Sequence, residues 1–239
     1  MPPRKQLPQS IVPFTNADKA EEERWTKKRS CDIANFPNPS RILLVGPPGL
    51  GKSTLIKNIL IRQDPPFDEA YVVHEDAEGT QEYEDLEPTD MMSDIPDLEW
   101  FNELPAHDAD GNTIKRCMIL DDLEFTSAHK ERLKNLATLL RYASTHKGFT
   151  VYLAHQDMFS LPTIARKMCN VFCVWRPRAR QEVTLIENRC GLAKGALKAL
   201  FDTCCREPRD CLVIDHTLRS PAPLRKNVWE VIPETLQDA

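Results

Sequence analysis

The stretch VGPPGLGKST, residues 45–54, has the residue types and the spacing of a loop that binds phosphate. Gly46 is followed after four residues by Gly51, Lys52 and Ser53, as in the pattern G-x-x-x-x-G-K-[ST]. Glycines let backbone N–H groups converge on one anion, the lysine reaches the β- and γ-phosphates, and the serine holds Mg²⁺. The pattern predicts that ATP and Mg²⁺ bind at Gly46, Pro47, Pro48, Gly49, Leu50, Gly51, Lys52, Ser53 and Thr54.

Carboxylates follow the apolar stretch CMIL, residues 117–120. In P-loop enzymes such a strand lies beside the strand that precedes the loop, so its tip faces the nucleotide. We expect Asp121 to hold Mg²⁺, mainly through water, and Asp122 to orient or deprotonate the attacking water. Many P-loop enzymes have the longer glutamate at the position of Asp122, and Glu124 is a lesser candidate.

A third candidate group closes the stretch VYLAHQD, residues 151–157. The amide of Gln156 would sense the γ-phosphate or hold the attacking water, although it could also be only a polar residue at the end of a strand. We interpret His155 as a packing or orienting residue. A further group should be an arginine from a neighbouring subunit that stabilises the transferring phosphoryl group, for which the sequence offers Arg141, Arg166, Arg176, Arg178 and Arg180.

Short apolar runs alternate with segments of helical periodicity, which predicts an α/β fold with a mostly parallel sheet flanked by helices. The predicted strands are residues 41–45, 70–74, 100–104, 116–120, 150–154, 171–175, 211–215 and 227–232. The predicted helices are residues 17–29, 55–61, 127–144, 161–168 and 182–205, the last with an interruption near Gly191. We expect an N-terminal arm with a short helix at residues 1–38, then one ATPase domain at residues 39–239 with late strands at 210–232.

The charge of −5 is distributed unevenly. Residues 63–114 contain 17 Asp and Glu and no Lys or Arg, whereas residues 1–62 and 115–239 each carry a net charge of +6. Two basic segments around an acidic one remain compatible with binding of nucleic acid. The acidic segment is either a solvated surface or a surface that faces a protein partner and points away from DNA.

Other sites and environments have weaker support in the sequence. The eight cysteines, in a chain without a secretory signal, are best interpreted as reduced thiols. The group Cys204, Cys205, Cys211 and His216 fits no common zinc spacing, and residues 108–112 are better explained as a turn than as a calcium loop. No run of 18 apolar residues exists, so we expect no membrane span.

Four motifs follow one another in a recognisable order: GPPGLGKST at 46–54, MILDDLE at 118–124, RYASTHKGFTVYLAHQ at 141–156 and LPTIARKMCNVFCVWRP at 161–177. This order resembles the viral genome-packaging ATPases of the FtsK–HerA superfamily, in the poxvirus-type branch with its virophage and Polinton-like relatives. The similarity covers residues 36–178, and SPAPLRKNVWEVI at 220–232 resembles the C-terminal end of that group. The strand that ends in Gln156, followed by a helix with Arg166, is the more specific part.

The resemblance implies a RecA-like core that works as a hexameric or pentameric ring and pumps double-stranded DNA into a preformed capsid. It implies contacts with capsid proteins and action inside the infected cell, in the nucleus or a cytoplasmic virus factory, or within the virion. The family roles carry over to Lys52, Ser53, Asp121, Asp122 and Gln156.

One departure from the family concerns the arginine. Many relatives have Arg directly before the histidine that precedes the glutamine strand, where this chain has Thr145 before His146. Arg141 lies one helical turn earlier on the same face, and Arg166 is the alternative.

Two other classes of function use a similar loop. A nucleotide or metabolite kinase also has a phosphate loop, but such kinases usually carry an arginine-rich lid and lack a sensor strand that ends in glutamine. A non-catalytic nucleotide-binding capsid scaffold would not need the paired Asp121 and Asp122.

Overall fold

The structure is a computed structural model that describes residue 34, residues 36–217 and residues 224–233. Its helical elements are α2 (Lys52–Ile61), η1 (Glu84–Leu86), α3 (Leu98–Glu103), α4 (Lys130–Thr138), the π-helical turn η2 (Leu139–Ala143), α5 (Ser144–His146), α6 (Thr163–Met168), α7 (Arg180–Cys190) and α8 (Ala196–Thr203). Its strands are β1 (Arg41–Val45), β2 (Glu69–His74), β3 (Asp90–Met92), β4 (Arg116–Asp121), β5 (Phe149–His155), β6 (Val171–Trp175), β7 (Cys211–Asp215), β8 (Arg225–Lys226) and β9 (Glu230–Val231). The predicted helix at 17–29 lies outside the described residues.

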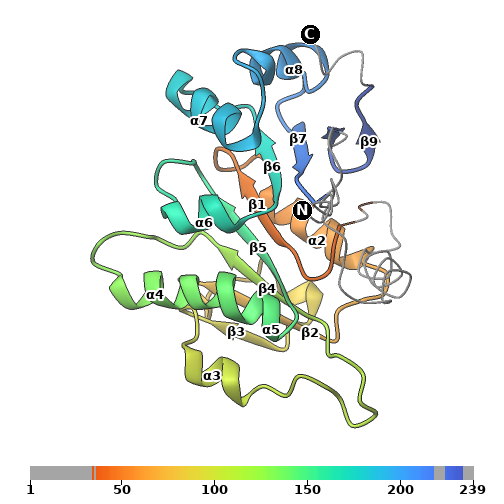
Figure 1. The fold of residues 1–239 in the computed structure, drawn as a ribbon, viewed down its shortest axis with the longest axis vertical. Coiled ribbons are helices and arrows are strands. Elements are labelled where there is room, and N and C mark those ends of the chain that lie inside the picture. Colours follow the sequence, from red (N-terminus) through yellow and green to blue (C-terminus); the bar gives the residue numbers. More distant parts are fainter. Residues whose placement is uncertain (1–33, 35, 218–223, 234–239) are drawn as a thin grey trace, which may run out of the picture.

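The strands form one sheet in the order β3-β2-β4-β5-β1-β6-β7-β8-β9 (Figure 1). The six strands from β3 to β6 are parallel, and β7, β8 and β9 add to one edge in antiparallel pairs. The predicted α/β class with a mostly parallel sheet is confirmed. One detail differs from the sequence-based expectation: the strand that carries the acids, β4, is not the neighbour of β1, the strand that precedes the loop, because β5 lies between them.

Both faces of the sheet are buried, which explains the continuous apolar runs of its central strands. Residues of β1 alternate between two cores: Leu43 and Val45 join the core under α3, α4 and α6 to α8, whereas Ile42 and Leu44 join the core under α2. Figure 1 shows the central strands between α2 and the row of helices from α4 to α7. No helix in the described part of the chain combines the length and the apolar character needed to cross a membrane.

The strand predicted at residues 100–104 is wrong, because residues 100–103 belong to helix α3 and Leu104 follows its end. The Asp97 side chain accepts a hydrogen bond from the backbone N–H of Trp100 at 3.0 Å, which caps the start of the helix. Phe101 is buried, and its ring packs edge-to-face on Trp100 and Phe149. Two consecutive aromatic residues suit a strand or a helix, and here the cap and the packing decide.

The strand predicted at residues 227–232 is also wrong in its first half. Asn227 and Val228 have φ of 52° and 74° and form a turn between β8 and β9. Asn227 holds this turn in place, because its Oδ1 accepts the Cys211 N–H at 2.9 Å and its Nδ2 donates to Asp210 at 2.8 Å. These contacts across 16 and 17 positions of sequence enforce a conformation that a β-branched residue seldom adopts.

Other elements differ from their predicted bounds by a few residues, and one strand was not predicted. Helix α2 begins at Lys52, three residues before the predicted start, since Gly51 caps it at φ 92°. The predicted helix at 127–144 is the run of α4, η2 and α5, and the predicted interruption near Gly191 separates α7 from α8. Strand β3 lies in the acidic stretch for which the sequence predicted no element.

Candidate active site

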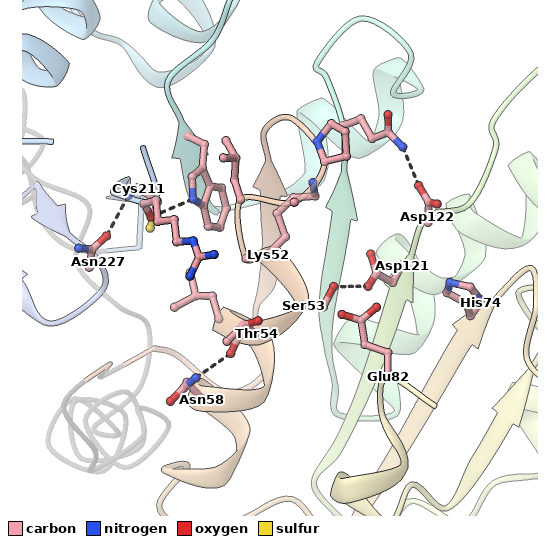
Figure 2. Close-up of a pocket in the computed structure, with 18 of the residues that line it drawn as sticks. Lys52, Ser53, Thr54, Asn58, His74, Glu82, Asp121, Asp122, Cys211 and Asn227 are labelled. Atoms are coloured by element: carbon pink, nitrogen blue, oxygen red, sulfur yellow. Dashed lines mark hydrogen bonds between the residues drawn. The ribbon is translucent and has the colours of Figure 1, made fainter. Parts of the chain in front are cut away.

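A cleft of about 890 Å³ opens at the carboxyl ends of the central strands. Figure 2 shows side chains from the loop after β1, from α2 and from the end of β4 that point into it. We call one side the phosphate wall, formed by Pro48–Thr54, Asp121, Asp122 and Gln156, and the opposite side the far wall, formed by Trp175, Arg209, Cys211, Asn227 and Trp229. The remaining lining residues are Leu55, Asn58, Arg62, His74 and Glu82.

The loop between β1 and α2 is held against its neighbours in the sheet. Gly46 donates its N–H to the His155 carbonyl at 3.2 Å, which ties the loop to the end of β5. A Cβ on Gly46 would lie 2.5 Å from the Trp175 Cβ, so only glycine fits beside the end of β6. Gly49 and Gly51 adopt φ of 75° and 92°, which form the tight turn before the helix.

Lys52 lies over this loop and among acidic groups. Its Nζ donates to the carbonyl oxygens of Gly46 at 2.7 Å and Pro47 at 3.1 Å. Burial lowers the pKa of the Lys52 ammonium, and the charges of Asp121, Asp122 and Glu82 oppose that effect. The lysine therefore places a cation where the loop can hold a phosphate.

The loop and the end of β4 meet at Ser53 and Asp121, as the dashed line in Figure 2 shows. Ser53 Oγ donates to Asp121 Oδ2 at 2.8 Å, and Asp121 is buried although it borders the cleft. A hydroxyl and a carboxylate are hard oxygen donors, and Mg²⁺ in such sites takes one or two carboxylates and the phosphates of its substrate. The two residues fit Mg²⁺ on the chemistry of their donors.

Asp122 and Gln156 meet at the mouth of the cleft. Asp122 has a φ of 52°, a conformation that Asp tolerates better than most residues, and its Oδ1 accepts a hydrogen bond from Gln156 Nε2 at 3.0 Å. Because β5 is the direct neighbour of β4, their carboxyl ends lie side by side and the two side chains meet. Both side chains are exposed to solvent, so a water molecule can reach them.

The loop after Gln156 is stabilised by hydrogen bonds within the loop and by one with Glu182 of α7. Asp157 Oδ1 accepts the N–H groups of Phe159 and Ser160 at 2.7 and 2.9 Å, and Glu182 Oε1 accepts the N–H of Met158 at 3.0 Å. Burial lowers the pKa of His155, whose Nδ1 lies 3.2 Å from Ser160 Oγ. These contacts fit an orienting function for the histidine.

The segment after Asp122 is held by the charged side chains of Glu75 and Arg132. Glu75 accepts the N–H of Glu124 at 3.1 Å, and Arg132 donates to the Glu124 carbonyl at 2.9 Å. Arg132 also forms ion pairs with Glu75 and Asp94. Glu124 itself does not line the cleft, so it is a component of this support.

The candidate arginines lie outside the cleft of their own chain. Arg141 is exposed on η2, and Arg166 is half-buried on α6, where it donates to Thr163 Oγ1 at 3.2 Å. Arg176 pairs with Asp202 at 2.7 Å and packs on the Phe201 ring, which assigns it a structural contact. Arg178 and Arg180 are exposed at the start of α7.

Sequence reasoning missed several residues that border the cleft. His74 and Trp175 end predicted strands, so their position at the carboxyl edge was a signal that could have identified them. Glu82, Arg209 and Trp229 carry no local signal, since only the folded chain brings them to this edge. Tyr83, behind the cleft, was missed for the same reason.

The acidic segment 63–114 is not only a solvated surface. Several of its carboxylates pair with cations from elsewhere in the chain: Glu69 with Arg116, Asp85 with Lys57, and Asp94 with Arg132. Among the described residues, no group of three or more His, Cys, Asp or Glu is placed to hold a metal ion.

Neither a scan with protein-family models nor a search of curated proteins finds a match for the sequence. Solved structures, however, share the fold. B204, the DNA-packaging ATPase from Sulfolobus turreted icosahedral virus, superposes with a TM-score of 0.54 at 16% identity and covers 79% of this chain and 97% of B204. The genome-packaging NTPase B204 from Sulfolobus turreted icosahedral virus 2, in complex with AMPPCP, gives a TM-score of 0.50 at 16% identity over 80% of this chain and 98% of B204.

The cytoplasmic domain of the Thermomonospora curvata type VII secretion ATPase EccC also superposes, with a TM-score of 0.52 at 14% identity over 87% of this chain and 28% of EccC. At these identities the superpositions establish the fold. The chain therefore has the fold of P-loop ATPases such as B204, in agreement with its sequence resemblance to viral genome-packaging ATPases of the FtsK–HerA superfamily.

Proposed function

We propose that the chain is an ATPase that drives double-stranded DNA into a preformed viral capsid. The observation that carries this proposal is the meeting of Lys52, the Ser53–Asp121 pair and the Asp122–Gln156 pair at one edge of the sheet. The fold adds support, because its solved examples include a DNA-packaging ATPase.

The phosphate wall accounts for hydrolysis of ATP. Lys52 and the loop would hold the β- and γ-phosphates, and Ser53 and Asp121 would hold the metal ion. Mg²⁺, when bound, supplies neutralisation of phosphate charge. Asp122 would orient the attacking water or accept its proton, while the Gln156 amide holds the same water in line with the phosphorus.

The far wall provides room for the nucleoside. The cleft continues from Thr54 and Leu55 toward Asn227 and the half-buried Trp229, whose ring has the Arg62 guanidinium 5.6 Å from its centroid. The Trp229 ring and the Leu55 side chain are suitable surfaces for a base, because each buries apolar area of a planar ligand.

The proposed function also includes a ring of subunits and a DNA duplex. Since the candidate arginines lie outside their own cleft, one from a neighbouring subunit would stabilise the transferring phosphoryl group, with Arg141 and Arg166 as candidates. The exposed Arg178 and Arg180 would contact DNA phosphates without sequence preference. Duplex affinity that is unchanged when both are replaced by Gln would contradict this assignment. The site of action would be the infected cell or the virion.

The decisive experiment measures phosphate release from ATP by the purified chain, with and without long duplex DNA. Lys52→Ala is the blank, because it removes the phosphate-binding cation from the loop. Strong stimulation by duplex DNA in the wild type, absent in the variant, is expected. Transfer of phosphoryl groups to a small acceptor without DNA stimulation would instead indicate a kinase, and nucleotide binding without any phosphate release would indicate a scaffold.

A further inference from the structure

We infer that Tyr83 positions the metal-binding carboxylate and thereby makes part of the acidic segment a component of the active site. The inference rests on the proposed function, since it concerns the Mg²⁺ that Ser53 and Asp121 would hold. Tyr83 does not line the cleft and would not touch ATP, so it is a positioning residue and not a catalytic one.

The carrying observation is a shared carboxylate oxygen. The Tyr83 hydroxyl donates to Asp121 Oδ2 at 2.5 Å, and the same oxygen accepts the Ser53 hydroxyl at 2.8 Å. Rotation of an aspartate about its last torsion is otherwise soft. Two donors on one oxygen fix that rotation and so set the direction of the whole carboxylate toward the cleft.

Burial makes the Tyr83 hydroxyl dependent on its contact with Asp121. Tyr83 is completely buried in the core that contains Val72 and Ile119, and a buried hydroxyl without a partner is costly. The Tyr83 hydroxyl is therefore held on Asp121, the acceptor that the structure gives it.

The segment around Tyr83 is anchored to the helix of the phosphate loop. Lys57 on α2 donates to the Glu82 carbonyl at 2.6 Å and pairs with Asp85 at 3.0 Å. Glu82 points toward Ser53 and Asp121 in Figure 2. Residues 82–85 therefore contact both α2, through Lys57, and the end of β4, through the Tyr83 hydroxyl. The metal ion would lie between these two elements.

Tyr83→Phe tests the inference, because it keeps the ring and removes only the donor. Tyr71→Phe is the matched control: the Tyr71 hydroxyl donates to Glu69 at 2.7 Å, and neither residue lines the cleft. Calorimetry measures the affinity for ADP with MgCl₂ and with EDTA, and the ratio of the two reports the contribution of the metal ion. We expect Tyr83→Phe to reduce this ratio about tenfold, as a lost hydrogen bond to a charged group implies, with ADP affinity in EDTA unchanged.

The Mg²⁺ concentration for half-maximal phosphate release should rise in Tyr83→Phe and stay constant in Tyr71→Phe. Lys57→Met removes the anchor on α2 and leaves the Tyr83 hydroxyl in place, so it provides a second test. It should shift both measurements in the same direction by less. A ratio equal to that of the wild type in Tyr83→Phe would overturn the inference while leaving the proposed function intact. Absence of any Mg²⁺ effect on ADP affinity in the wild type would overturn both.

Discussion

The two walls of the cleft differ in how the fold builds them. The phosphate wall comes from parallel strands, whose carboxyl ends all reach the same edge, and its polar side chains bond to its carboxylates: Ser53 to Asp121, and Gln156 to Asp122. The far wall comes from the antiparallel edge, where the start of β7 pairs with the end of β6 and the turn after β8 lies beside it. Some of its polar groups form contacts that hold the wall itself, such as Trp175 Nε1 with the Arg209 carbonyl at 3.1 Å.

This difference suggests a division of work. In the proposed function the groups of the phosphate wall act on phosphate and water, so changes there should affect turnover. The far wall has surfaces and structural hydrogen bonds, so changes there should affect nucleotide affinity and stability.

The largest effect is expected at Asp122. Asp122→Asn keeps the shape, the tolerance of positive φ and an acceptor for Gln156, but removes the group that would take a proton from water. We expect kcat for ATP hydrolysis to fall about 10²-fold or more with KM little changed, since general-base contributions have this size. Steady-state kinetics checks the split, with Glu124→Gln as the control carboxylate that lies outside the cleft. Equal losses of kcat in both variants would contradict the role of Asp122 as the base that takes a proton from water.

Gly46→Ala should damage the junction of the two walls. The new Cβ would lie 2.5 Å from the Trp175 Cβ, a side-chain atom next to the backbone that cannot yield easily. We expect a loss of about 1–3 kcal/mol in the free energy of unfolding, as for other overpacked cores. Chemical denaturation measures it. The control is Gly49→Ala, where a Cβ meets nothing within 4 Å and only the φ of 75° is unfavourable. A larger loss at Gly49 would show that the contact with Trp175 is easily relieved.

Trp229→Ala sharpens the assignment of the far wall. If the ring is a surface for the base, its removal should raise KM for ATP about fivefold, in the range of a lost aromatic contact, and leave kcat unchanged. Phosphate-release kinetics over a range of ATP concentrations separates the two constants. A fall in kcat at constant KM would break the proposed division between the walls.

The smallest effect concerns pH and Asp210, which holds the far wall. Burial alone would raise the pKa of Asp210, but hydrogen bonds from Asn227, the Glu207 N–H and Lys226 outweigh it and leave the pKa below the ordinary 3.8. The unfolded chain therefore takes up the proton first, so this contribution to stability is complete above pH 3.8 and is lost as pH falls through the lower pKa of the folded state.

Asp210→Asn should cost about 1 kcal/mol of unfolding free energy at neutral pH. The difference from the wild type should shrink toward the lowest pH at which both variants are folded. Denaturant titrations at a series of pH values measure this, and a difference that stays constant with pH would contradict the assignment of charge to Asp210.

Most of the phosphate wall could be predicted from the sequence because it is local. The loop from Gly46 to Thr54 is contiguous, and Asp121 and Gln156 close apolar runs whose length and composition already mark them as strands. Residues 100–104 and 227–229 show the limit, since a helix cap from Asp97 and a turn held by Asp210 override patterns that suit a strand.

The sequence by itself determined which residues form the predicted phosphate loop and that parallel strands would deliver the candidate site residues to one edge, because a loop motif and buried strands are encoded by neighbours in the chain. The tertiary structure alone decided that β5 lies between β4 and β1, that Tyr83 reaches Asp121 across 38 positions, and that Trp175 and Trp229 line the same cleft. The physical reason is that strand order, burial and the paths of long connections depend on how both cores fill together, and no local pattern contains that information.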